Sequence, residues 1–294
     1  MGYANFLEEW NALLDRRPTF RAPLTVYVPI LAAWAEWPRD GVAPLPWAPE
    51  ACRERWGRGV PLLSEATPTI AAEALEPLLG PVLDALAALG TEAEVLQRFA
   101  RAWDVGEIGA SAFFPERGRI GSAAVQGATG LSQEALGFLA YASLRPALDQ
   151  YLAGCRPHLA ARGWSLGVCP FCGAPPGFID LLDDGQRYLA CHLCGGAWTF
   201  SRLCCPYCGN QNPRELVRLA AEDKEEGYAI AACRVCHGYV KELDRRVRWN
   251  AGSSLVEDWG TPHLDLIAQR EGYWRAVPTL IQLDRPGDLE RPKP

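Results

Sequence analysis

Four Cys-x-x-Cys pairs between residues 169 and 236 constrain this chain more than any other feature of its sequence. Two thiolates three residues apart on a tight turn can both reach one tetrahedral ion at about 2.3 Å. Two such pairs close a four-thiolate site, so the sequence predicts two metal sites. The eight predicted ligands are Cys169, Cys172, Cys191, Cys194, Cys205, Cys208, Cys233 and Cys236.

The four pairs form two copies of one plan. Each copy opens on Cys-Pro-aromatic-Cys-Gly, at residues 169–173 and 205–209, and returns to a second pair after 18 and 24 residues of β-like sequence. This internal duplication, together with short closing loops, favours a site within each copy. Interleaved pairing, of the first pair with the third and the second with the fourth, stays open.

The residues around the cysteines suit a metal-binding turn, which we call a knuckle. Proline fixes φ at the bend, and glycine after the second cysteine permits a positive φ and lets N–H groups point at the sulfurs. His237 stands where the other three knuckles have glycine, which suggests a different backbone conformation there. A segment with so little apolar core would draw much of its folding free energy from the bound metal.

The sequence does not choose between iron and zinc, because four thiolates suit both ions. The Cys-Pro-aromatic-Cys-Gly knuckle resembles that of rubredoxin, which favours iron. A site filled by four protein thiolates has no open position for substrate, which argues against hydrolytic catalysis. The remaining cysteines are interpreted as a spare thiol, Cys204, and two core residues, Cys52 and Cys155.

The length of the chain and its hydrophobic pattern predict an α+β fold. Its 294 residues, 49% of them hydrophobic, suffice for a large core. Helical periodicity dominates up to about Gly163, and short β-like runs follow from Gly167, such as Phe178–Leu182 and Arg187–Ala190. We expect a helical N-terminal domain, two tandem rubredoxin-like or zinc-ribbon β modules, and a C-terminal helix at Pro262–Tyr273. The predicted domain ranges are 1–163, 164–203, 204–250 and 251–294.

The helical half offers several local signals. Pro18 should end the first helix, and Thr91 and Ser132 are candidate N-caps for later ones. Pro146 should kink or split the long helix after Ser132. Residues 38–61 and 104–129 are rich in proline or glycine and are predicted to be loops.

The same sequence argues against several classes of protein. It has no basic n-region at its start and no apolar stretch long enough for a membrane helix, so we expect a cytoplasmic protein without a membrane. In that compartment, paired cysteines bind metal more often than they form disulfides. The net charge is −6, and residues 165–250 hold ten Lys plus Arg and ten Asp plus Glu. Such a balance does not favour nucleic acid.

We find no catalytic constellation. There is no phosphate-binding loop and no Gly-x-Ser-x-Gly elbow, and His192 and His237 are expected on exposed turns. The chain is therefore interpreted as a binding protein and not an enzyme. A zinc-ribbon protein that binds nucleic acid or acts as an adapter is one alternative. A second is an iron-based one-electron carrier to a client enzyme.

The order of motifs resembles the formate dehydrogenase accessory protein family, FdhE. The resemblance covers residues 165–275 with specific motifs, and the N-terminal half by length and helical character. The motifs are Cys169-Pro-Phe-Cys172-Gly-Ala-Pro-Pro, Arg187-Tyr-Leu-Ala-Cys191-His-Leu-Cys194, Cys205-Pro-Tyr-Cys208-Gly-Asn, Cys233-Arg-Val-Cys236-His-Gly-Tyr239-Val-Lys241, Glu257-Asp258, His263-Leu-Asp-Leu and Glu271-Gly-Tyr273. The resemblance implies a cytoplasmic assembly or activation factor that binds the catalytic subunit of formate dehydrogenase. It also implies rubredoxin-like metal sites at the eight cysteines named above.

Overall fold

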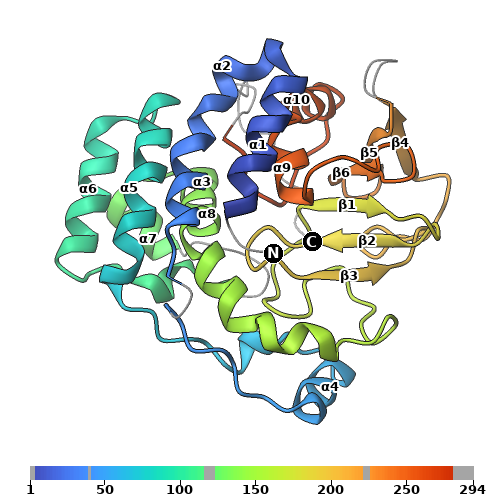
Figure 1. Ribbon diagram of the computed structural model, residues 1–294, viewed down its shortest axis with the longest axis horizontal. Helices are drawn as coiled ribbons and strands as arrows, with labels where there is room; N and C mark the ends of the chain where they lie inside the picture. Colours follow the sequence, from blue (N-terminus) through green and yellow to red (C-terminus); the bar gives the residue numbers. More distant parts are fainter. Residues whose placement is uncertain (1–3, 39–40, 116–122, 221–225, 281–294) are drawn as a thin grey trace.

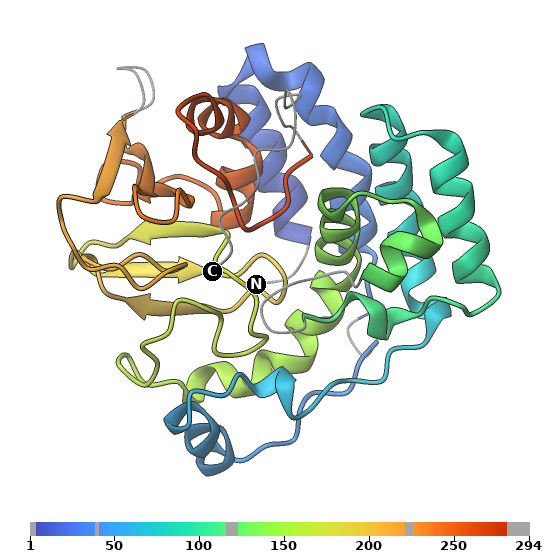
Figure 2. The same cartoon turned by 180° about the vertical axis from the view of Figure 1, so that it is seen from behind.

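The helices of the first half lie beside a six-stranded β-sheet built by the second half (Figure 1). This computed structural model describes residues 4–38, 41–115, 123–220 and 226–280. The reverse view shows the same division between helices and sheet (Figure 2). The predicted α+β fold, with a helical N-terminal part followed by zinc-ribbon-like modules, is confirmed.

The helical half is a bundle whose apolar faces meet in one core. Its α-helices are α1 (Ala4–Arg16), α2 (Arg21–Leu24), α3 (Val28–Ala35), α4 (Pro49–Gly57), α5 (Ala72–Ala88), α6 (Ala93–Asp104), α7 (Ala123–Thr129) and α8 (Gln133–Leu152). Short 3₁₀ turns are η1 (Pro18–Phe20), η2 (Thr25–Tyr27), η3 (Leu62–Ser64), η4 (Ala110–Phe113) and η5 (Ala153–His158). The long helices α5 and α8 pack against each other.

Local signals predicted some helix ends and missed others. The Ser132 hydroxyl caps α8 by accepting from the Ala135 N–H at 3.1 Å. Helix α6 begins at Ala93, and its N-cap residue is Glu92, so the assignment of Thr91 was wrong. Pro146 does not split α8, because the helix runs through that residue. Most of α8 is buried, and packing of that surface outweighs one missing backbone hydrogen bond.

Two predicted loops contain helices. Helix α4 lies within residues 38–61, and α7 lies within residues 104–129. Pro49 stands in the first turn of α4, where its missing N–H costs nothing, so the proline there starts a helix. Helix α4 buries Cys52 and Trp56 against the rest of the chain, and this tertiary contact has no local signature.

The sheet joins the two cysteine modules edge to edge. The first module contributes β1 (Phe178–Leu181), β2 (Arg187–Ala190) and β3 (Ala197–Phe200), and the second contributes β4 (Leu216–Ala220), β5 (Tyr228–Cys233) and β6 (Tyr239–Asp244). Each module is an antiparallel meander, and the strand order is β3-β2-β1-β6-β5-β4. Strands β1 and β6 pair in parallel, with Phe178 opposite Lys241. The two modules therefore share one sheet.

The C-terminal part bridges the sheet and the helices. Helix α9 (Ser254–Trp259) contacts both α1 and β1, and α10 (Pro262–Arg270) packs on β5 and β6. The predicted C-terminal helix thus ends at Arg270, and α9 precedes it. Trp259 stacks on Tyr27 with ring centroids 4.6 Å apart. Residues 281–294 of the predicted range 251–294 lie outside the described residues. Among those that are described, no helix is long and apolar enough to cross a membrane.

Two candidate metal centres

All four knuckles share one backbone hydrogen bond. The N–H of the first cysteine donates to the carbonyl oxygen of the residue five positions later. These pairs are Cys169 with Ala174, Cys191 with Gly196 and Cys205 with Asn210, each at 2.8 Å, and Cys233 with Gly238 at 3.0 Å. The repeated bond closes each turn around its two sulfurs and supports an internal duplication.

The residue after the second cysteine takes the left-handed conformation in every knuckle. Gly173, Gly195 and Gly209 have φ values of +79°, +78° and +72°, and His237 has a φ of +55°. The different conformation suggested for the His237 knuckle was therefore wrong. Histidine enters the same conformation despite the cost that a Cβ atom adds there.

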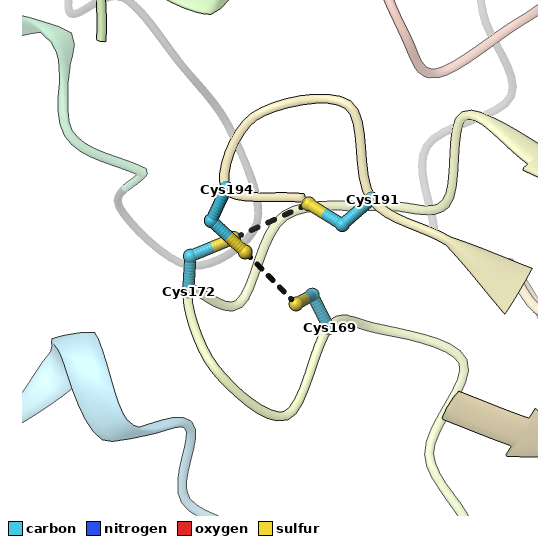
Figure 3. A group of neighbouring side chains, drawn as sticks. All are labelled: Cys169, Cys172, Cys191 and Cys194. Carbon is cyan, nitrogen blue, oxygen red and sulfur yellow. Dashed lines mark hydrogen bonds between the residues drawn. The ribbon is translucent and has the colours of Figure 1, made fainter. Parts of the chain in front are cut away.

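The knuckles bring the eight cysteines together in two groups of four. Site 1 is the group Cys169, Cys172, Cys191 and Cys194, and site 2 is the group Cys205, Cys208, Cys233 and Cys236. In site 1, the Cys169 and Cys194 sulfurs are 3.6 Å apart, and those of Cys172 and Cys191 are 3.4 Å apart (Figure 3). Both corresponding distances in site 2 are 3.7 Å. Each group lies within one module, and neither shows interleaved pairing.

These distances fit a tetrahedral ion. Four sulfurs at about 2.3 Å from a central ion stand about 3.8 Å from one another. The charge of the donor set points the same way. Burial raises the pKa of the Cys169 and Cys172 thiols well above the ordinary value. Four ionised thiolates in so buried a place would need a cation among them. The donor set of each site therefore fits zinc or a single iron ion.

Site 1 is enclosed by the helical half. The Arg145 side chain, on α8, donates to the Cys191 carbonyl at 3.0 Å and to the His192 carbonyl at 2.8 Å. The Trp56 indole N–H donates to the Pro170 carbonyl at 3.0 Å. Backbone N–H groups of Leu62 and Leu63 donate to the same knuckle. All four site 1 cysteines are buried.

Site 2 lies closer to solvent. Cys208 is exposed and Cys236 is half-buried, whereas Cys205 and Cys233 are buried. Its hydrogen bond with Cys236 lowers the pKa of Cys205 to about 5. Trp274, from the segment after α10, donates to the Cys236 carbonyl at 2.6 Å. The contacts of this site thus come from the sheet and the C-terminal segment.

A buried ionic network lies behind site 1, and sequence reasoning missed it. Asp258 of α9 accepts from His192 at 2.9 Å and from Arg275 at 2.6 Å. Lys241 of β6 lies 2.9 Å from Asp258 and 2.6 Å from Asp265. The prediction that His192 lies on an exposed turn was wrong, because its side chain is buried. The available signal was a lysine in the middle of a run predicted to be a strand, between Val240 and Glu242.

The three other cysteines lie outside both groups. Cys204 is buried beside site 2, and its thiol is 3.7 Å from the Cys205 carbonyl oxygen. Cys52 and Cys155 are fully buried in the helical half. Burial raises the pKa of the Cys155 thiol to about 12, and its hydrogen bond with Cys52 adds to the effect. These two are core residues, as expected from the sequence.

Known proteins resemble this chain in sequence and in fold. The family model "FdhE, central domain" matches residues 168–202, which contain site 1. A "Protein FdhE homolog" of Stutzerimonas stutzeri is 35% identical over 48% of this chain and 50% of its own length. Another, of Aquifex aeolicus, is 30% identical over 49% of this chain and 51% of its own length. The match to these curated relatives thus spans about half of each length.

The fold extends the likeness over nearly the whole chain. The crystal structure of the FdhE protein from Pseudomonas aeruginosa matches with a TM-score of 0.63 and 23% identity, covering 95% of this chain and 94% of that one. At that identity the match establishes a shared fold. Sequence and fold together confirm the resemblance to the FdhE family.

Proposed function

We propose, from the confirmed resemblance to the FdhE family, that this chain is a cytoplasmic accessory protein that assists the assembly or activation of formate dehydrogenase. In this role it binds the catalytic subunit of that enzyme and carries one metal ion in each of sites 1 and 2. The observation that carries the proposal is the pair of four-cysteine groups on a fold similar to that of an FdhE protein. The domain ranges 1–163, 164–203, 204–250 and 251–294 are part of the proposal.

The eight cysteines are the proposed ligands, four to each ion. A bound divalent ion would supply the positive charge that offsets four thiolates, and iron would add the capacity for one-electron chemistry. The knuckles orient the sulfurs, and both ligand sets are complete without a water or substrate. The ions therefore serve the fold or carry electrons, and they do not act as Lewis acids.

An iron-based electron carrier is the second candidate. The exposure of Cys208 supports it, because a ligand at the surface offers a short path from site 2 to a docked protein. Site 1 has no such ligand. Zinc in both sites would remove this candidate and leave the accessory role intact.

Metal analysis and a pull-down test the proposal together. We expect two ions per chain, with a red ferric spectrum for iron and no colour for zinc. We also expect the full chain to retain the formate dehydrogenase catalytic subunit from a host that makes it. A chain with fewer than two ions would contradict the metal assignment. Absence of the subunit from the retained fraction would contradict the partner, and salt-sensitive retention on DNA or RNA would favour the nucleic-acid alternative.

A further inference from the structure

We propose that the client protein docks over a pocket beside site 2, where it places an acidic side chain flanked by apolar residues. This inference rests on the proposed function, because it assigns a surface to the expected partner. The contacts of site 1 lie within the chain, whereas site 2 has an exposed ligand and an adjoining hollow. The sites therefore differ in what they can offer another protein.

The pocket lies between the sheet and the first knuckle of site 2. It encloses about 400 Å³, which is within the range of small ligand sites and can take one or two side chains. Strands β1, β2, β4, β5 and β6 contribute to its wall, as does the segment that leads into Cys205. A partner that enters this pocket would thus contact both modules and site 2 at once.

The charge of the pocket selects an acidic occupant. Four arginines line it, and two of them have carboxylate partners: Arg218 pairs with Glu242 at 2.8 Å, and Arg246 pairs with Asp244 at 2.6 Å. The other two are Arg187 and Arg202. The side chains that line the pocket, cysteines apart, therefore carry two positive charges in excess.

Arg187 and Arg202 bond only to backbone carbonyls within the described part of the chain. The Arg187 guanidinium donates to the Ser201 and Cys204 carbonyls, each at 3.0 Å. Arg202 donates to the Gly185 carbonyl at 3.2 Å. Arg187 is only 6% exposed; burial lowers the pKa of its guanidinium, and the nearby charges of Glu242 and Cys205 act against that shift. Four thiolates around a divalent ion carry a net charge of −2, which can offset the buried Arg187 beside site 2. Arg202 is exposed, so it is the group that meets an incoming carboxylate.

Exposed apolar groups surround the same site. Leu203 lines the pocket and is 59% exposed, and Val235, between the ligands Cys233 and Cys236, is 58% exposed. Apolar side chains next to a guanidinium are typical of the centre of a protein interface. An acidic residue with apolar neighbours in the client would satisfy both kinds of group.

The test compares charge and apolar variants at this pocket with matched variants elsewhere. The full, metal-loaded chain is titrated against the purified catalytic subunit by biolayer interferometry. The pocket variants are Arg202→Glu and Leu203→Asp. Their controls are Arg101→Glu, on the exposed face of α6, and Leu89→Asp, where the leucine is 44% exposed after α5. Figure 1 shows that these helices lie at the opposite end of the molecule from β4.

We expect each pocket variant to raise Kd about tenfold or more, and each control to change it by less than about twofold. Arg202→Lys should retain most of the affinity, because it keeps the charge. Metal content is measured for every variant, so that a loss of site 2 itself is detected.

Equal effects of the pocket and control variants, with two ions retained, would overturn the docking surface while leaving the proposed function standing. Failure of the unaltered chain to bind the subunit would overturn the proposed partner, and the docking surface with it.

Discussion

Sites 1 and 2 have the same local backbone but different surroundings. Their knuckles share a closing hydrogen bond and a left-handed residue after the second cysteine. Side chains from α4 and α8 donate to the knuckles of site 1. The side chains that donate to site 2 are Asn210, from the second cysteine module, and Trp274, from the segment after α10. The turn geometry is therefore the same in both sites, and the packing around it differs.

The difference indicates two roles for one motif. Site 1 stands where the helical half, the sheet and α9 meet, so loss of its ion would open contacts in all three. The contacts of site 2 come from the sheet and from the segment after α10, so loss of its ion would disturb those two parts. We therefore infer that site 1 holds the protein together and site 2 faces its partner.

The largest expected effect separates the sites directly. We predict that Cys191→Ser causes loss of the site 1 ion and unfolding that spreads into the helical half, because coordination and folding are coupled. Cys233→Ser should cause loss of the site 2 ion and destabilise the second cysteine module, which contains β4, β5 and β6. The native helical content should be largely retained. Metal stoichiometry and thermal unfolding followed by far-UV circular dichroism measure both results.

The exposed ligand Cys208 allows the two sites to be compared without a substitution. A chelator added to the unaltered chain should remove the site 2 ion faster than the site 1 ion. The Cys233→Ser variant should lack this fast phase of metal loss. Equal loss of helical signal in the two variants would contradict the distinction. So would a fast phase that persists without Cys233.

The buried network supplies the next largest effect. Burial alone would raise the pKa of Asp258, but Arg275 and Lys241 outweigh it and hold that pKa well below its ordinary value. We predict that Asp258→Asn lowers the free energy of unfolding by about 3–5 kcal/mol at pH 7, because it leaves two buried cations short of a counter-charge. The variant should also lose the site 1 ion faster than the unaltered chain does, since Asp258 holds His192.

The pH dependence follows from the direction of that shift. A carboxyl group with a lowered folded-state pKa contributes stability above its unfolded pKa of about 3.9, and this contribution is lost as the pH falls through the folded value. The deficit of Asp258→Asn should thus be full at pH 7 and shrink below about pH 4. Asp15→Asn is the control: its side chain is 75% exposed and pairs with Arg21, so it should cost at most about 1 kcal/mol. A deficit independent of pH would contradict the ionic role.

The sequence predicted what depends on neighbours along the chain. Strand β2 falls at the predicted residues, and β1 differs from its prediction by one, because turns and cysteine knuckles bound these short runs. Turns and short connecting runs also bring the two cysteine pairs of each copy together. The domain boundaries near residues 163, 203 and 250 stay predictions.

What the sequence could not predict depends on distant contacts. The parallel pairing of β1 with β6 joins residues more than 60 positions apart, and no local pattern encodes it. His192 was predicted to be exposed because its partner, Asp258, lies 66 positions away. Helix α8 continues through Pro146 because its buried face outweighs the missing hydrogen bond. Each of these three features depends on packing between parts of the chain.

The smallest expected effect tests whether the four knuckles are equivalent. His237 has a φ of +55°, a conformation that costs a residue with a Cβ atom about 1–2 kcal/mol. We predict that His237→Gly, which restores the residue found in the other knuckles, stabilises site 2 by about 0.5–1 kcal/mol, because the extra freedom of glycine in the unfolded chain offsets part of the gain. Gly209→Ala, in the partner knuckle of the same site, should have the opposite sign, since glycine there has a φ of +72°. Thermal unfolding and chelator competition measure both changes. If His237→Gly weakened site 2 as much as Gly209→Ala does, the prediction would be wrong. The histidine side chain would then stabilise site 2 by more than the left-handed backbone conformation costs. Its contact with the Tyr273 ring, 6.1 Å between centroids, is the first place to look for that contribution.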